Sequence, residues 1–430
     1  MAWIGFGLIM TFMVLIMSRR LSAVVALILV PVIFALAAGF APDELGQMII
    51  KGITTLAPTA IMLMFAIYYF SLMHDVGLFD PMVNRIVGFA GNDPLRIAIG
   101  TMLLSAVVSL DGDGATTVLI VVTALLPIYK RVGMNPLILV LLLLITNTSI
   151  NLVPWGGPTA RAAAALHLDA GEIFIGLIPA MLTGLIFAFA LAVLFGLKER
   201  KRLQDVLLTL PKNAQSTTIS PELDHIRRPK LYFFNLFLTL CLIGGMATGL
   251  APLPVLLMVG FAVALLVNYP KLVEQKQRIE AHSSSVIAVV SMIFAAGAFT
   301  GILNGTGMTD AMSAAIMSQL PDHAGSHLVA ITAFLGIPMT FAMSNDAFFF
   351  GILPVIAASA DSYGLNLVHI AQASVLGQMV HGLSPLVAAG YLMSGLVNRD
   401  IGEMQRFCLF WALLGVLLQI LVTLFFQSLA

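Results

Sequence analysis

Long apolar segments separated by short polar ones run through the whole chain. In the first half they cover about residues 3–17, 21–40, 54–73, 95–128, 136–160 and 172–197, and in the second half about 231–250, 252–269, 283–303, 327–360, 367–397 and 405–428. A helix needs roughly 20 apolar residues to cross the hydrocarbon core of a bilayer. The pattern therefore predicts an all-α polytopic membrane protein, in which the polar segment 198–230 is a cytoplasmic linker between two halves.

Two of the apolar segments are interrupted by polar side chains. The segment 95–128 divides at Gly112, and the segment 327–360 divides at Asn345. Because the arms of the first are only about 16 residues long, short for a full crossing, we expect both segments to be re-entrant hairpins. Each half then has about five transmembrane helices and one hairpin, ten spans in all. An odd number of spans inverts the second half relative to the first, and inverted repeats with broken helices are typical of secondary transporters.

Composition and charge support a membrane protein and indicate its orientation. The 430 residues are 60% hydrophobic and 10% charged, whereas soluble domains carry about 25% charged residues. A formal net charge of zero gives no indication of a nucleic-acid partner. Basic residues fall mainly on one predicted side of the membrane, at Arg19, Arg20, Arg85, Lys130, Arg131, 198–202, Arg227, Arg228, Lys271 and Arg399. The positive-inside rule then places the N-terminus outside, with Lys51 and Arg161 as the main exceptions.

The first interruption, residues 109–117, combines carboxylates, glycines and hydroxyls within an apolar surrounding. Intramembrane carboxylates usually face a water-filled functional site, so Asp111 and Asp113 are candidates to carry a proton or to face a metal ion. Exposed amides at a helix start attract anions. The candidate anion-binding groups here are the amides of Gly112 and Gly114 and the hydroxyls of Thr116 and Thr117. The alternative is that Asp113 only caps the following helix and Asp111 is structural.

The span that follows contains a sequence that no continuous helix accommodates easily. After Asn147, Thr148 and Asn151 comes Pro154-Trp155-Gly156-Gly157-Pro158-Thr159, which predicts an unwound segment with free backbone groups. We expect these polar side chains, Gly156, Gly157 and Thr159 to contact the substrate. Arg161 is the best-placed cation for an anion. Alternatively, the span simply ends here with Trp155 in the interfacial aromatic belt and Arg161 as an anchor.

A second polar interruption lies in the other half of the chain. Ser344 and Asn345 are expected to bind substrate, and Asp346 to carry a proton or face a metal, while the aromatic run 348–350 is expected to pack. Its partner is the break at 377–385, which offers Gln378, His381 and Ser384. His381 could relay protons or could be a satisfied structural donor.

The scarcity of cations near these stretches restricts the substrate. Arg161 is the one arginine near them, and they contain no lysine. A tricarboxylate would therefore be bound mainly by amides, hydroxyls and helix ends. A substrate that carries its own divalent cation eases this problem, since citrate with Mg²⁺ or Ca²⁺ has a net charge of about minus one. We therefore expect no tightly bound cofactor, and a divalent ion that travels with citrate.

Four stretches of this sequence resemble the signatures of the CitMHS family of bacterial metal–citrate:proton symporters, within the ion transporter superfamily. They are Ser109-Leu110-Asp111-Gly112-Asp113-Gly114, Pro154-Trp155-Gly156-Gly157-Pro158-Thr159-Ala160-Arg161, Met343-Ser344-Asn345-Asp346-Ala347-Phe348 and Gln378…His381…Leu383-Ser384-Pro385-Leu386. The resemblance covers nearly the whole chain. It implies proton-driven uptake of citrate with a divalent metal across the bacterial inner membrane, and a homodimer. Where the family often has hydroxyl-bearing residues near the tips, this chain has Val118 and an all-Phe run.

The resemblance also implies an elevator-type fold with two kinds of domain. The scaffold would be 1–94 plus 231–326, and the mobile transport domain 95–197 plus 327–430, joined by the linker 198–230. Three other functions stay open: a sodium-coupled di- or tricarboxylate symporter, a passive channel and, remotely, an intramembrane aspartyl protease. The protease is disfavoured because its two aspartates should lie on facing helices, whereas Asp111 and Asp113 share one tip.

Overall fold

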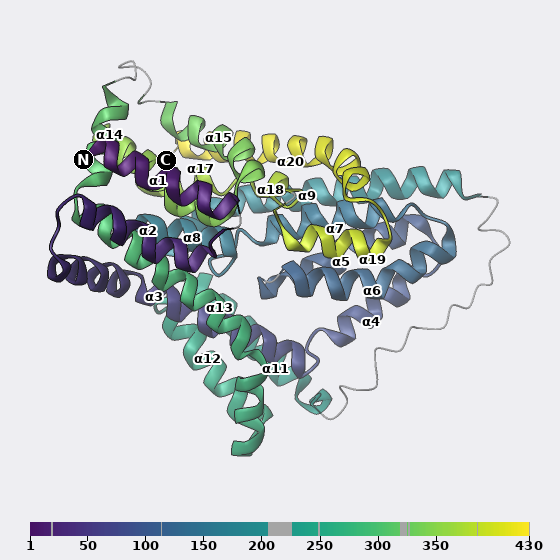
Figure 1. Cartoon of the computed structure of the whole chain (residues 1–430). Coiled ribbons are helices and arrows are strands. Elements are labelled where there is room, and N and C mark those ends of the chain that lie inside the picture. Colours follow the sequence, from purple (N-terminus) through teal and green to yellow (C-terminus); the bar gives the residue numbers. More distant parts are fainter. Residues whose placement is uncertain are drawn as a thin grey trace.

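The computed structural model describes residues 1–430 except Arg19, Asp113, 205–225, 248–249, 319–324, Ser326, Pro385 and Ala430. All regular secondary structure within these described residues is helical (Figure 1). Six of the described helices are long and apolar enough to cross a membrane, and several shorter apolar helices accompany them. The protein is therefore an all-α polytopic membrane protein, as the hydropathy pattern predicts.

The two halves of the chain follow a similar order of elements. The first half has α1 (Ala2–Met17), α2 (Ala23–Ala37), α3 (Pro42–Asp75), α4 (Asp80–Ala90), α5 (Pro94–Val108), η1 (Ser109–Asp111), α6 (Gly114–Val132), α7 (Pro136–Ile150), α8 (Gly157–Leu166) and α9 (Ala170–Arg202). The second half has η3 (Pro229–Leu231), α11 (Tyr232–Ala247), α12 (Leu253–Asn268), α13 (Leu272–Gly305), α14 (Met308–Met317), α15 (Leu328–Ala342), η5 (Ala347–Ile352), α16 (Leu353–Ser362), α17 (Leu367–Ser374), α18 (Gln378–His381), α19 (Ala388–Val397) and α20 (Ile401–Leu429). The element η3 has no counterpart in the first half, and two short helices, α17 and α18, stand where the first half has one. The third α-helix of each half, α3 in the first and α13 in the second, has 34 residues.

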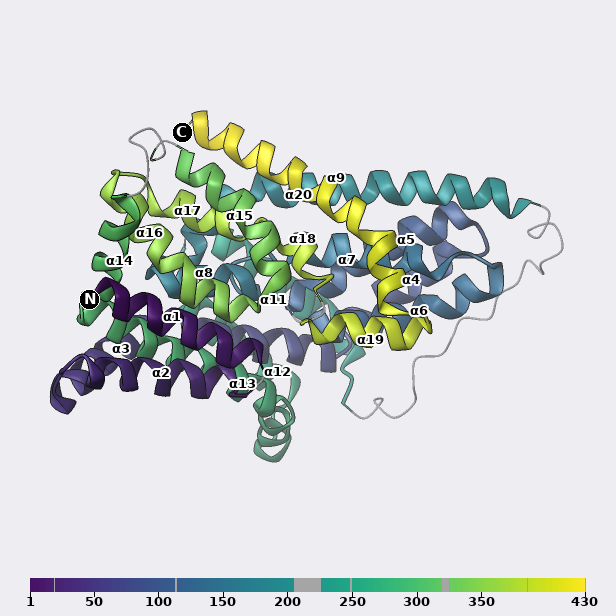
Figure 2. The same cartoon turned by 45° about the horizontal axis from the view of Figure 1, so that its top comes forward.

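Equivalent helices of the two halves pack against each other reciprocally. Helix α12 packs on α3 and α2 packs on α13, while α16 packs on α8 and α6 packs on α19. Helices α9 and α20, the last long helix of each half, lie side by side in both views (Figures 1 and 2). The halves therefore interlock rather than folding as separate units.

Glycines allow the close approach of α3 and α13 at the centre of this packing. A Cβ atom on Gly52 would lie 2.0 Å from the carbonyl oxygen of Gly297 and 2.8 Å from the Cα atom of Gly301. No rotamer change relieves a contact with backbone atoms. This crossing therefore requires residues without side chains on both helices.

Several boundaries differ from those the apolar pattern predicts. The spans expected at 54–73 and 283–303 belong to α3 and α13, which extend through polar turns at their first residues. In α3 the extension is stabilised by Glu44, whose carboxylate accepts a hydrogen bond from the backbone N–H of Ala41 at 3.1 Å. Hydropathy does not register such local capping. Helices α4 and α14 were not expected, because each is short and only partly apolar.

The arms around the first tip are also unequal. Helix α5 has 15 residues, close to the expected arm, but α6 has 19 and passes the length and hydropathy criteria for a span. Helix α9 runs to Arg202, five residues into the segment expected to be linker. Residues 205–225 of that expected linker lie outside the described residues.

Candidate functional site

The expected break in the first half is present. Helix α7 ends at Ile150 and α8 begins at Gly157. The hydroxyl of Thr159 donates a hydrogen bond to the carbonyl oxygen of Leu152 at 2.9 Å and so ties α8 to the unwound segment. A Cβ on Gly156 would lie 2.0 Å from the carbonyl oxygen of Asn151. The turn between the two helices therefore closes too tightly for a side chain at Gly156.

Trp155 supports the first tip and does not lie in an interfacial belt. Its side chain is buried, stacks on Phe70 with ring centroids 5.2 Å apart, and donates its indole N–H to the carbonyl oxygen of Leu110 at 2.9 Å. Gly112, which directly follows η1, has φ +78°, and a Cβ atom there would lie 3.3 Å from the indole ring of Trp155. The backbone of Asp111 belongs to η1, and Asp113 lies outside the described residues.

Trp155→Phe keeps the stacking on Phe70 but removes the indole donor, leaving the carbonyl of Leu110 without it. A lost hydrogen bond of about 1 kcal/mol predicts a rise of about fivefold in the half-saturating substrate concentration. Uptake into proteoliposomes measures it. Trp3→Phe is the matched control, because Trp3 is exposed on α1. Equal half-saturation in the two variants would show that the tip does not depend on this bond.

The second tip joins α15 to η5 through extended backbone. Met343 has φ −133° and ψ 168°, and the hydroxyl of Ser344 accepts a hydrogen bond from the backbone N–H of Ala347 at 3.2 Å. The phenylalanines at 348–350 are fully buried, which confirms their expected packing role. Ser344 therefore caps the new helix start, and Asn345 and Asp346 are left as the polar side chains of the tip.

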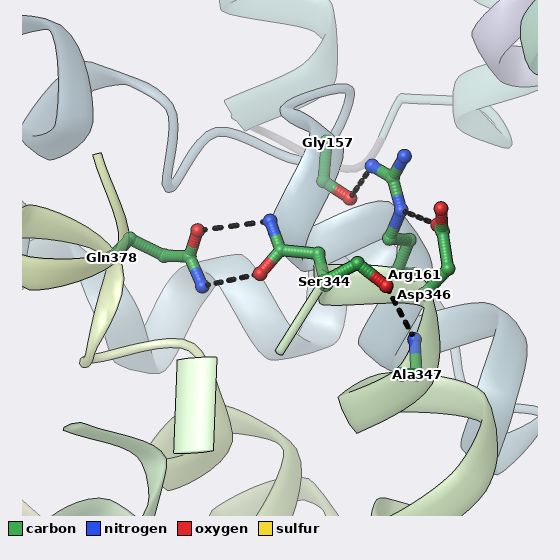
Figure 3. A network of polar contacts seen from close by, with 7 residues as sticks. Gly157, Arg161, Ser344, Asp346, Ala347 and Gln378 are labelled. Carbon is green, nitrogen blue, oxygen red and sulfur yellow. Dashed lines mark hydrogen bonds and ion pairs between the residues drawn. The ribbon is translucent and has the colours of Figure 1, made fainter. Parts of the chain in front are cut away.

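The second break is fixed to the second tip by hydrogen bonds. His381 donates from Nδ1 to the carbonyl oxygen of Thr340 at 2.5 Å, and the hydroxyl of Ser384 donates to the carbonyl oxygen of Phe341 at 2.7 Å. The side-chain amides of Asn345 and Gln378 exchange two hydrogen bonds of 3.2 Å (Figure 3). His381 and Ser384 therefore both serve as structural donors to α15.

An ion pair joins the two halves at the same place. The Nε of Arg161, on α8, donates to Oδ1 of Asp346 at 2.7 Å, and its Nη1 donates to the carbonyl oxygen of Gly157 at 3.1 Å (Figure 3). Both side chains are largely buried, with exposed fractions of 28% and 16%. Sequence reasoning gave Arg161 and Asp346 separate roles and missed that they form a pair.

A cavity of about 200 Å³ lies where the two breaks and the two tips meet. The predicted residues that line it are Gly112, Gly114, Asn147, Thr148, Asn151, Gly157, Arg161, Asn345, Gln378 and His381. The remaining lining residues, which sequence reasoning missed, are Val118, Leu143, Leu144, Pro158, Gly382, Val387, Ala389 and Met393. Most of these are apolar residues in helical stretches, and no local signal distinguishes them from core residues.

Other predicted residues support the cavity without lining it. Thr117 and Thr159 are fully buried, Thr116 is partly buried, and Gly156 shapes the turn between α7 and α8. Ser344, Ser384 and Asp346 make the hydrogen bonds and the ion pair described above. Among the described residues, no group of three or more His, Cys, Asp or Glu side chains is arranged to hold a metal ion.

Two asparagines carry the polar wall on the α7 side of the cavity. The amide of Asn147 donates to the hydroxyl of Ser109 at 3.0 Å, and that of Asn151 donates to Oδ1 of Asn147 at 3.4 Å. Oδ1 of Asn151 is buried and accepts no hydrogen bond within the described part of the chain. A buried acceptor without a donor is costly, so this atom is suited to a ligand.

Broken helices from both halves, meeting around a polar cavity inside a bundle of apolar helices, define a membrane transporter. The profile of one family, described as "Citrate transporter", matches residues 12–377. The chain belongs to this family, CitMHS, and is a transporter rather than an enzyme. The family resemblance drawn from the four motifs is thereby confirmed, and the aspartyl protease alternative is excluded.

Similar proteins cover almost all of the chain. It is 51% identical over 412 residues to a protein of Bacillus subtilis (strain 168) named "Citrate transporter", covering 96% of this chain and 95% of that protein. It is 47% identical over 424 residues to the "Mg(2+)/citrate complex secondary transporter" of the same organism, covering 99% and 98%. The crystal structure of the Alcanivorax borkumensis YdaH transporter, described as having an unusual topology, matches with a TM-score of 0.56 at 14% identity over 90% of both chains. That likeness shows the fold alone.

Proposed function

We propose that this transporter takes up citrate as a complex with a divalent cation, Mg²⁺ or Ca²⁺, in symport with protons. The observation that carries the proposal is the charge of the cavity. Arg161 supplies the cationic side chain of its described lining, and this charge is already paired with Asp346. The rest of the lining offers side-chain amides, the hydroxyl of Thr148, the imidazole of His381 and apolar groups.

The citrate trianion would be poorly compensated in such a site. A buried charge without a partner is strongly disfavoured. A citrate–metal complex of charge about minus one needs far less compensation. The similarity to a protein named for transport of the Mg²⁺–citrate complex supports the same substrate class.

The mechanism we propose is alternating access by an elevator motion. The mobile unit would comprise 95–197 and 327–430, which contain both tips, both breaks and every described lining residue of the cavity. The scaffold would comprise 1–94 and 231–326, whose long helices α3 and α13 cross at glycines. We further propose inverted halves, a homodimer, the bacterial inner membrane as location and an outside N-terminus.

The test is uptake of labelled citrate into proteoliposomes with an inward proton gradient, with Mg²⁺, with Ca²⁺ or with EDTA. Uptake that requires the divalent ion and is abolished by a protonophore supports the proposal, and the most effective ion gives the subtype. Uptake that persists in EDTA contradicts metal–citrate as the substrate. Counterflow of labelled citrate, which a passive pore does not show, distinguishes a carrier from a channel.

A sodium-coupled carrier is the second candidate, and one observation favours it. The buried, donor-free Oδ1 of Asn151, directly after α7, could also contact a small cation. Replacing Na⁺ with choline while the proton gradient is held constant distinguishes sodium coupling from proton coupling. Uptake that stops in choline and survives a protonophore would establish sodium coupling.

A further inference from the structure

The Arg161–Asp346 pair is placed to respond directly to an anionic substrate. Arg161 lines the cavity, and its Nε and Nη1 are engaged by Asp346 and Gly157. Its Nη2 makes no hydrogen bond within the described part of the chain (Figure 3). A guanidinium is a rigid fork with five N–H donors, so it can donate hydrogen bonds to a carboxylate in the cavity while it is still close to Asp346.

Few other charges compete with this pair. Within the described lining, His381 is the other ionisable side chain, and its Nδ1 is committed to the carbonyl of Thr340. Helices α1 and α13 both pack on η5. Helix α1 has no ionisable side chain, and α13 has none between residues 283 and 303. On α16 the ionisable residue is Asp361, which is exposed at the far end of that helix.

Substrate binding changes the net charge at the Arg161–Asp346 pair. Before binding, Arg161 and Asp346 sum to zero. A citrate–metal complex that brings a net negative charge to the guanidinium leaves two anions at one cation in a largely buried site, which is strongly unfavourable. A proton on the carboxylate of Asp346 restores neutrality, because Arg161 then pairs with the substrate and Asp346 is a neutral carboxylic acid.

We propose that Arg161 and Asp346 form the coupling switch, in which the substrate carboxylate replaces Asp346 as the partner of Arg161 and Asp346 takes up one proton. This inference rests on the proposed function, since it assumes an anionic citrate–metal complex as substrate. It goes beyond that function because it assigns the coupling proton to the carboxyl group of Asp346. The proton is released when Asp346 replaces the substrate carboxylate as the partner of Arg161. Asp346 would act when the substrate arrives, and the empty carrier would keep the ion pair.

The test measures proton uptake on binding. Calorimetric titration of the purified, detergent-solubilised protein with Mg²⁺–citrate and with Ca²⁺–citrate, in two buffers of different ionisation enthalpy, gives the protons taken up per bound complex. We expect about one proton for the wild type and about none for Asp346→Asn, which imitates the protonated carboxyl and therefore still binds. Between about pH 7 and 8.5 the wild-type affinity should fall by about tenfold per pH unit, and that of Asp346→Asn by less than about twofold.

Two further variants control for damage to the site. Asp361→Asn removes a carboxylate from the same hairpin outside the cavity and should keep wild-type proton uptake. Asp346→Glu keeps a titratable carboxyl group and should also take up about one proton per bound complex. Proton uptake that persists in Asp346→Asn, or loss of binding in that variant, overturns the switch while leaving citrate–metal transport intact. A wild type that binds neither Mg²⁺–citrate nor Ca²⁺–citrate overturns the proposed function and this inference with it.

Discussion

Arg161→Gln is expected to reduce citrate uptake by about 100-fold or more. The substitution removes the cation of the described cavity lining and leaves the carboxylate of Asp346 largely buried without its partner. Truncating one member of a buried, hydrogen-bonded charge pair costs roughly 2–5 kcal/mol, and about 3 kcal/mol corresponds to about 100-fold. Initial rates of labelled citrate uptake in proteoliposomes, normalised to reconstituted protein, measure the effect.

The matched control is Arg96→Gln. Arg96 also lies near a carboxylate, at 3.7 Å from Asp93, but its side chain is 59% exposed, and exposed ion pairs contribute little. Its uptake should stay near the wild-type rate. Arg161→Gln should also lower the unfolding temperature, because it leaves the charge of Asp346 unpaired. The double variant Arg161→Gln/Asp346→Asn removes that charge, so it should unfold at the wild-type temperature but still lack uptake. Wild-type uptake in Arg161→Gln would remove Arg161 from the substrate site.

The second large effect is expected at the crossing of α3 and α13. Gly52→Ala adds a Cβ that would lie 2.0 Å from a backbone oxygen of α13, so the helices must separate along their contact. Overpacking of this kind costs about 3 kcal/mol, a large fraction of the stability of most proteins. We expect a lower thermal unfolding temperature in detergent and a lower yield of monodisperse protein.

The control for that prediction lies on the same helix. Gly46 is exposed on α3, and a Cβ there meets nothing within 4 Å. Gly46→Ala should therefore be neutral or stabilising by up to about 1 kcal/mol, because alanine has the higher helix propensity. Equal unfolding temperatures for the two alanine variants would contradict the close helix crossing.

Local sequence chemistry predicted the interruptions well. The closely spaced prolines and glycines at 154–158 strongly disfavour a continuous helix, so the break between α7 and α8 follows from the local backbone. The same holds for the glycine turn at Gly112 and for Ser344, which caps the start of the helix after the second tip. The apolar segments likewise determined an all-α membrane protein. Their ends were less predictable where capping extended a helix through polar residues, as at Glu44.

The tertiary structure alone decided which polar groups meet. Arg161 and Asp346 are 185 residues apart in sequence, and each had a plausible separate role until the structure placed them 2.7 Å from each other. Trp155 likewise had two possible surroundings, and only packing against Phe70 decided between them. The sequence by itself determined where the helices break, because proline, glycine and capping side chains act on neighbouring backbone. Partners across the cavity depend instead on how the two halves interlock, and that arrangement has no local signature.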